Sequence, residues 1–253
     1  MDLNLNDRRA LVTAATDGIG LATATELARM GAHVWITGRQ EDTVEGALQV
    51  IRDSVPEGNV AGIVADAGSA AGCSRVIDAL PVVDILVNNL GIYDTEVDFL
   101  SLGDDEWERY FRINVMSGIR LARHYLAGML EADRGRIVFV SSESAQNVLP
   151  DSVHYSMTKA AQLAISRGIA ERTTGTRVTC NAVLPGPTRS AAVDAALAGG
   201  ATEAEMLPHT SLLRRLAEPE EVADMIAWVC SNAASATNGA ALRVEGGCVR
   251  TIT

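Results

Sequence analysis

Short apolar runs alternate with longer amphipathic stretches along the whole chain, and this alternation narrows the possible folds. Apolar runs rich in β-branched residues predict buried strands, and apolar residues at i, i+3 and i+4 predict helices. Regular alternation of the two indicates βαβ units and a parallel sheet. We expect strands at 9–14, 32–37, 60–65, 82–88, 135–141, 176–183 and 240–244, and helices at 18–30, 41–54, 69–79, 104–131, 153–174 and 219–231.

No repeat, low-complexity tract or linker interrupts this pattern over the 253 residues, so we expect one domain spanning 1–253. Right-handed crossovers would give a doubly wound sheet that binds ligands at the carboxyl ends of its strands. A net charge of −11 disfavours a nucleic-acid or anionic-membrane partner. The four widely spaced cysteines predict reduced thiols and no metal site, and no export or membrane segment is recognisable; we expect a cytoplasmic protein.

The first predicted strand runs into a turn at 13–20 that contains Gly18 and Gly20, and a helix follows. Such a turn brings the backbone and the free N–H groups of a helix close to a pyrophosphate. Ala14 stands where the first of three expected glycines would be, and it would strain the turn if it needs positive φ. A strand-to-helix turn also needs glycine for structural reasons alone, so both interpretations stay open.

The second predicted strand ends at Gly38 and Arg39 instead of a carboxylate. An acidic residue here would bind ribose hydroxyls, whereas an arginine would accept a 2′-phosphate, so the pair favours NADP(H) over NAD(H). Asp17 argues against that preference, and Arg39 could instead be a solvated residue before a helix. Asp66 and the run 88–91 lie where the adenine and its ribose would pass, although Asn88 could equally bridge two strands.

The chain has a single lysine, Lys159, and it stands four residues after Tyr155. At this spacing on a helix both side chains lie on one face, where an ammonium can favour the ionised form of a phenol. A bias against lysine codons would explain the missing lysines, but not the position of this one.

Taken together, these motifs resemble the short-chain dehydrogenase/reductase family over essentially the whole chain. The matches, in family order, are the turn at 13–20, Asn88-Asn89-Leu90-Gly91, Asn114, Ser142, Tyr155 with Lys159, and Pro185-Gly186. Ser142 is preferred to Ser141 because it lies 13 residues before Tyr155. The resemblance implies a doubly wound Rossmann fold with a seven-stranded parallel sheet in the order 3-2-1-4-5-6-7.

The resemblance also implies a catalytic set. Ser142 would donate a hydrogen bond to a carbonyl oxygen, and Tyr155 would deliver its proton. Lys159, with the oxidised nicotinamide, would lower the pKa of the phenol and hold the ribose. Asn114 would position a water that links Lys159 to solvent; alternatively, it bends its helix by bonding its own backbone.

The implied cofactor contacts, with Thr188 chosen over Ser190, are Thr13, Ala15, Thr16, Gly18, Ile19, Gly20, Arg39, Asp66, Ala67, Asn88, Gly91, Tyr155, Lys159, Pro185, Gly186 and Thr188. The segment 189–215 would form a substrate lid. Candidate substrate contacts are Tyr93, Ser144, Gln146, Leu149 and His154, with Glu143, Asn147 and lid residues near Leu207 and His209 as further candidates.

The expected function is NAD(P)(H)-dependent interconversion of a small carbonyl compound and its alcohol. A 3-oxoacyl-thioester reductase and a non-catalytic NADP(H)-sensing protein are the alternatives. The helices at 104–131 and 153–174 would join copies into a homodimer or homotetramer. Leu90, which replaces an alanine beside the cofactor path, is a second departure from the family pattern.

Overall fold

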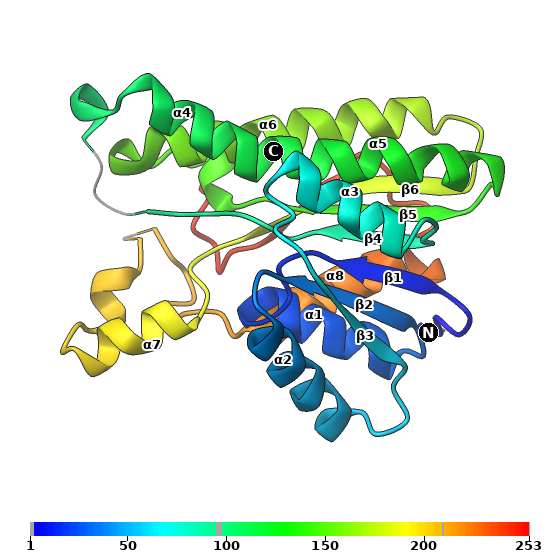
Figure 1. Cartoon of the computed structure of the whole chain (residues 1–253). Helices are drawn as coiled ribbons and strands as arrows, with labels where there is room; N and C mark the ends of the chain where they lie inside the picture. Colours follow the sequence, from blue (N-terminus) through cyan, green and yellow to red (C-terminus); the bar gives the residue numbers. More distant parts are fainter. Residues whose placement is uncertain (1–2, 95–97, 209, 253) are drawn as a thin grey trace.

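A computed structural model describes residues 3–94, 98–208 and 210–252 (Figure 1). Seven strands form one parallel sheet in the order β3-β2-β1-β4-β5-β6-β7, which confirms the predicted fold class and strand order. The strands are β1 (Arg9–Val12), β2 (His33–Gly38), β3 (Val60–Val64), β4 (Ile85–Asn88), β5 (Gly135–Val140), β6 (Val178–Pro185) and β7 (Ala241–Val244).

Helices cover both faces of the sheet (Figure 1). On one face lie α1 (Gly18–Arg29), α2 (Glu41–Ser54) and α8 (Pro219–Cys230), and on the other α3 (Ala70–Ala79), α5 (Met116–Glu131) and α6 (Val153–Arg172). Successive residues of a strand point to opposite faces. Val12 therefore joins the first core cluster, while its neighbour Leu11 joins the second. Burial on both faces explains why these strands are apolar throughout rather than alternating.

The helix predicted at 104–131 is interrupted. It consists of α4 (Asp104–Tyr110), a π-helical turn (Phe111–Val115) and α5. A π turn inserts one residue into the helix, and such insertions occur often at functional sites. The interruption places Asn114 within the turn, where it is 1% exposed.

The segment 189–215 contains α7 (Ala191–Ala198) and a 3-10 turn (Glu203–Met206), and α7 stands apart from the sheet at the lower left of Figure 1. Both ends of the segment are fixed: Arg189 N donates to Ala217 O at 2.9 Å, and Leu212 N donates to Gly246 O at 2.9 Å. His209, one of the predicted lid residues, lies outside the described residues. That this segment closes over a substrate stays a prediction.

The chain leaves β1, β4, β5 and β6 at the same edge of the sheet, because all the strands are parallel. The predicted nucleotide turn, the loop after β4, Ser142 and Pro185-Gly186 therefore meet at one edge. All four cysteines are buried free thiols. Among the described residues, no helix has the length and apolar character needed to cross a membrane.

Candidate active site

Tyr155 and Lys159 lie one turn apart on α6, as their spacing predicted. The Lys159 ammonium is 5.5 Å from the centre of the Tyr155 ring and donates to Val140 O, at the end of β5, at 2.9 Å. Only 4% of Lys159 is exposed. The lysine is therefore fixed between its own helix and the strand that leads to Ser142.

Burial controls the titration of this pair within the protein chain. It raises the pKa of Tyr155 to about 12, although a hydrogen bond with Ser142 opposes the rise. Burial also lowers the pKa of Lys159 to about 8. Within the chain alone, desolvation dominates the pKa of the phenol and raises it. That Lys159 together with the oxidised nicotinamide lowers this pKa stays a prediction.

Ser142 begins the 3-10 turn Glu143–Ala145 with an extended backbone. Its Oγ accepts two hydrogen bonds from Ser144: one from the backbone N–H at 3.2 Å and one from the hydroxyl at 2.8 Å. Ser141, by contrast, is 3% exposed and donates its hydroxyl to Lys159 O at 2.9 Å. This arrangement supports the choice of Ser142 as the serine that serves the site.

The Asn114 side chain holds the loop after β4. Its Nδ2 donates to Ile92 O at 3.0 Å and to Thr158 Oγ1 at 3.1 Å, and its Oδ1 accepts from Ile92 N at 2.7 Å. None of these partners belongs to its own helix, so the alternative in which Asn114 bonds its own backbone is wrong. Gln162 Nε2 donates to the Asn114 backbone carbonyl at 2.6 Å. The water that Asn114 would position stays a prediction.

The turn between β1 and α1 is closely packed and contains residues with positive φ. Gly18 has a φ of +53°, and a Cβ at Gly20 would lie 2.7 Å from Ala14 O. Ala14 itself has a φ of +51°, so the predicted strain is present. Asp17 caps α1 by accepting from Gly18 N at 2.7 Å, which gives this acidic residue a structural role.

Asn89 lies in the run 88–91 but was not among the predicted cofactor contacts, and the structure gives it several hydrogen bonds at the turn. Its Nδ2 donates to Thr13 O and to Ala14 O at 3.0 Å each, and its backbone N–H donates to Thr13 Oγ1 at 3.0 Å. Asn89 therefore links the loop after β4 to the nucleotide turn. The signal available in the sequence was the second asparagine of the pair Asn88-Asn89.

The end of β2 has no room for a carboxylate. A Cβ at Gly38 would lie 2.6 Å from Thr16 Cγ2 and 2.7 Å from Val44 Cγ2. The next residue, Arg39, is exposed, and among the described residues it has no ion-pair or hydrogen-bond partner. Its guanidinium is available for an anionic ligand beside the nucleotide turn.

Other predicted cofactor contacts have mixed surroundings. Ala15, Ala67 and Pro185 are buried, whereas Thr16 and Ile19 are half-buried and Asp66 is exposed. Thr188 Oγ1 donates to Gly186 O at 2.9 Å, so its hydroxyl closes its own turn.

Two of the predicted cofactor contacts, Gly91 and Asn88, lie next to open space or lack partners. A Cβ at Gly91 would lie 3.3 Å from Lys159 Nζ, so glycine leaves open the space in front of the lysine. Asn88 is 4% exposed, and neither atom of its side-chain amide has a partner among the described residues. A buried amide without partners costs about 1–3 kcal/mol, so a ligand or a water is needed to satisfy it. Whether these residues contact a bound dinucleotide stays a prediction.

The predicted substrate contacts divide into two groups. The Tyr93 ring lies 4.7 Å from the Tyr155 ring between centres and is 49% exposed, while Gln146 is exposed and Leu149 half-buried. Ser144 and His154 are 1% and 0% exposed, so their assignment as substrate contacts needs correction.

His154 packs in an aromatic contact instead of facing a ligand. Its ring lies 4.1 Å from the Tyr110 ring and 6.2 Å from the Trp107 ring, both on α4. Burial lowers the pKa of His154. The adjacent position of a histidine and the tyrosine in the sequence therefore reflects packing between α4 and α6.

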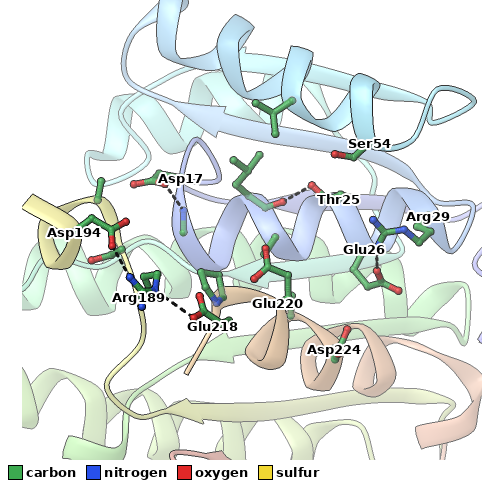
Figure 2. A pocket seen from close by; sticks show the side chains of 18 residues that line it. Asp17, Thr25, Glu26, Arg29, Ser54, Arg189, Asp194, Glu218, Glu220 and Asp224 are labelled. Carbon is green, nitrogen blue, oxygen red and sulfur yellow. Dashed lines mark hydrogen bonds and ion pairs between the residues drawn. The ribbon is translucent and has the colours of Figure 1, made fainter. Parts of the chain in front are cut away.

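A cavity of about 410 Å³ follows α1 (Figure 2). It meets the nucleotide turn at Asp17 and Gly18, and Figure 2 shows Arg189 at one end, paired with Asp194 and Glu218. Neither Tyr155 nor Lys159 lines it. The carboxylates along its wall outnumber the arginines, which disfavours an anionic ligand: Asp17, Glu26, Asp194, Glu218, Glu220 and Asp224 face Arg29 and Arg189.

The sequence of the chain is similar to a family model and to known proteins. A family model described as enoyl-(acyl carrier protein) reductase matches residues 13–249. The chain is 42% identical to the uncharacterized oxidoreductase YvaG of Bacillus subtilis, with 100% of both chains covered. It is 31% identical to dehydrogenase/reductase SDR family member 4 of Rattus norvegicus, with 96% of this chain and 88% of the relative covered.

A solved structure is also similar. The L-sorbose reductase of Gluconobacter frateurii, complexed with NADPH and L-sorbose, superposes with a TM-score of 0.92 at 28% identity and 100% coverage of both chains. The family match and the similarity to named SDR proteins cover nearly the whole length. The chain therefore belongs to the short-chain dehydrogenase/reductase family of oxidoreductases.

Proposed function

We propose that the protein is an NADPH-dependent reductase that converts a small hydroxylated ketone to a secondary alcohol, and the reverse. The observation that carries the proposal is the convergence of Ser142, Tyr155 and Lys159 at the carboxyl end of β5, beside the nucleotide turn. This arrangement supplies a hydrogen-bond donor, a proton donor and a cation at one place. A protein that only senses a nucleotide does not need all three.

The cofactor, when bound, supplies the hydride. The chain's own residues act on the carbonyl oxygen, where negative charge develops as hydride arrives. Ser142 donates a hydrogen bond to that oxygen, and Tyr155 transfers its phenolic proton to it. With a pKa of about 12, Tyr155 is fully protonated at neutral pH and is ready to act as the acid.

Regeneration of the tyrosine requires a proton from elsewhere. Lys159 has a pKa of about 8, close enough to neutrality to exchange protons with its surroundings. Its ammonium lies 5.5 Å from the ring centre, from where it favours the phenolate electrostatically. Asn114 fixes the loop at Ile92 in front of Lys159, and we assign it the positioning of the water that completes the relay.

The proposal of NADPH rather than NADH rests on Gly38 and Arg39 at the end of β2. Exposed Arg39 offers a free guanidinium, and the crowding at Gly38 leaves no room for a carboxylate that would bind ribose hydroxyls. NADPH in the structurally similar L-sorbose reductase supports this choice. Asp17 does not contradict it, because Asp17 is engaged as the cap of α1.

Replacing Arg39 with alanine tests the 2′-phosphate contact. We expect the KM for NADPH to rise at least about tenfold, since a charged hydrogen bond contributes about 1.5–3 kcal/mol. The KM for NADH should change less than about twofold. Steady-state kinetics with each cofactor measure both values, and an equal effect on the two would refute the contact. Arg52→Ala, on the distant end of α2, serves as the control.

The substrate class can be tested directly by turnover. The exposed Tyr93 and Gln146 give the entrance a mixed aromatic and polar character, and the similar solved enzyme binds a sugar. The experiment is a cofactor-consumption screen of ketones, ketoses and acyl thioesters, with NADPH and NADH in parallel and product identification by mass spectrometry. Turnover of hydroxylated ketones supports the proposal, and no turnover of any carbonyl compound refutes it.

A 3-oxoacyl-thioester reductase is the second candidate, because the matching family model carries an acyl-carrier description. The net charge of −11 disfavours an acidic carrier protein as a partner. Preference for acyl thioesters over ketoses in the same screen would select this candidate.

A further inference from the structure

Ser144 has its hydroxyl group directed at the proposed catalytic serine. The side chain lies within the 3-10 turn that Ser142 begins, and it is 1% exposed. Its Oγ donates to Ser142 Oγ at 2.8 Å, and its backbone N–H donates to the same oxygen at 3.2 Å. Because it is buried, the Ser144 hydroxyl cannot line the substrate entrance, which removes the role that the sequence suggested.

The two bonds restrict what Ser142 can do with its own proton. A serine hydroxyl has one proton to donate and two lone pairs that accept. Both acceptor positions of Ser142 Oγ face Ser144, so its proton must point away from the 3-10 turn. Ser142 lies close enough to Tyr155 to lower the pKa of the phenol, and the carbonyl oxygen of a substrate would lie between these two hydroxyls.

The hydrogen bond from Ser144 to Ser142 also affects how strongly the Ser142 hydroxyl donates. A hydroxyl that accepts a hydrogen bond becomes a better donor, by roughly 10–30% per bond. Burial of Ser144 keeps bulk water from competing for the same lone pair. We propose that Ser144 is a positioning residue that orients and polarises the Ser142 hydroxyl for carbonyl reduction. The role rests on the proposed function, because Ser142 has a carbonyl oxygen to bind only in that reaction.

Ser144→Ala removes the hydroxyl and keeps the backbone N–H. We expect kcat for ketone reduction to fall about tenfold, less than the 10²–10³-fold loss typical when a direct oxyanion donor is removed. The KM for the ketone and the Kd for NADPH should stay within about twofold, because Ser144 touches neither ligand. A rise in KM at unchanged kcat would mean that the hydroxyl contacts substrate and would overturn the proposal, as would an unchanged kcat.

Ser166→Ala is the matched control. Ser166 is a serine on α6 that is 2% exposed, and its hydroxyl meets Cys180 Sγ at 3.5 Å, away from Ser142. We expect its kcat to match that of the wild type. An equal loss in both variants would assign the effect to loss of a buried serine in general and would overturn the proposal. Ser144→Cys, which keeps a weak donor, should fall between Ser144→Ala and the wild type and gives a second test if the alanine variant folds poorly.

A spectroscopic measurement separates this inference from the proposed function. With ¹³C-labelled tyrosine, the Tyr155 signal can be identified by its loss in Tyr155→Phe and titrated by NMR. If Ser144 strengthens the bond from Ser142, the pKa of Tyr155 rises in Ser144→Ala and is unchanged in Ser166→Ala. An unchanged pKa in Ser144→Ala overturns the inference even where no substrate has been found. Absent turnover in the wild type, by contrast, counts against the proposed function alone.

Discussion

Lys159 holds its ammonium against the end of β5, beside Gly91. The side chain is 4% exposed, and its Nζ donates to Val140 O at 2.9 Å. A Cβ at Gly91 would come within 3.3 Å of the same nitrogen. An arginine would carry a planar guanidinium into this space and would keep its proton at any physiological pH. The single lysine of the chain thus stands where its many arginines could not substitute.

Lys159→Arg should therefore damage the enzyme even though charge is conserved. We expect kcat to fall at least about 100-fold, because the relay loses a group that can exchange its proton, and the Kd for NADPH to rise about tenfold from crowding. Fluorescence titration of NADPH and steady-state kinetics measure the two effects. Arg172→Lys, the reverse exchange at the end of α6, should change neither value. Wild-type turnover in Lys159→Arg would contradict the role given to this lysine.

Spacing predicted which side chains would be close, but not which would be buried. Tyr155 and Lys159 were placed together by the i, i+4 rule, and Asn114 and Ser142 by family order. Ser144 and His154 were interpreted as substrate contacts because polar residues near a catalytic tyrosine suggest a pocket. Their burial depends on contacts with Ser142 and with Tyr110, which are set by tertiary packing.

The turn at 13–20 carries local backbone strain at Ala14. Ala14 has a φ of +51°, which glycine adopts at lower energy. Its neighbours hold it there: Ala14 N donates to Thr37 Oγ1 at 3.0 Å, and Ala14 O accepts from Asn89 Nδ2 at 3.0 Å. Ala14 keeps its positive φ although glycine is missing here, because hydrogen bonds with β2 and with the loop after β4 fix it.

Ala14→Gly should raise the free energy of unfolding by up to about 1 kcal/mol, because relief of strain exceeds the added entropy of the unfolded chain. Urea denaturation followed by circular dichroism measures the change. Ala127→Gly, at an exposed position within α5, is the control and should lower the same quantity by about 1 kcal/mol. If Ala14→Gly lowered the free energy of unfolding by a similar amount, Ala14 would not be strained.

Among the elements, the interruption of the helix at 104–131 was the feature that sequence could not show. A π turn shifts the helical period by one residue, which a pattern of apolar residues does not resolve. Here the turn coincides with contacts from outside the helix, at Ile92, Thr158 and Gln162. Strand order, by contrast, followed from the alternation of strands and helices, because right-handed crossovers leave few topologies open.

At the scale of the whole molecule, burial of Lys159 links stability to pH. Its pKa falls from 10.5 to about 8 on folding, so between these values the unfolded chain binds more protons than the folded one. Stability arising from this group therefore rises with pH across that window. The pKa of Tyr155 is raised to about 12, so its contribution is lost only above pH 10, where the free phenol begins to ionise.

Lys159→Met removes this titrating group and should isolate its effect on the pH dependence of stability. Between pH 7 and 10 we expect the wild type to gain stability relative to the variant, by at most about 3 kcal/mol, since each unit of pKa shift corresponds to about 1.4 kcal/mol. Urea denaturation of both proteins at several pH values gives the difference and cancels the titration of the buried cysteines. A difference that is flat or falls with pH would show that the lysine is not destabilised by burial.

The sheet brings four separate stretches of sequence to one edge, and in the proposed reaction Tyr155 acts there as the acid. The most direct measurement is turnover of Tyr155→Phe with NADPH and an accepted ketone, together with the Kd for NADPH. Loss of the phenolic proton should lower kcat by at least about 100-fold, while the Kd stays within about threefold of the wild type. A variant that binds NADPH normally and still reduces the ketone at the wild-type rate would contradict the account.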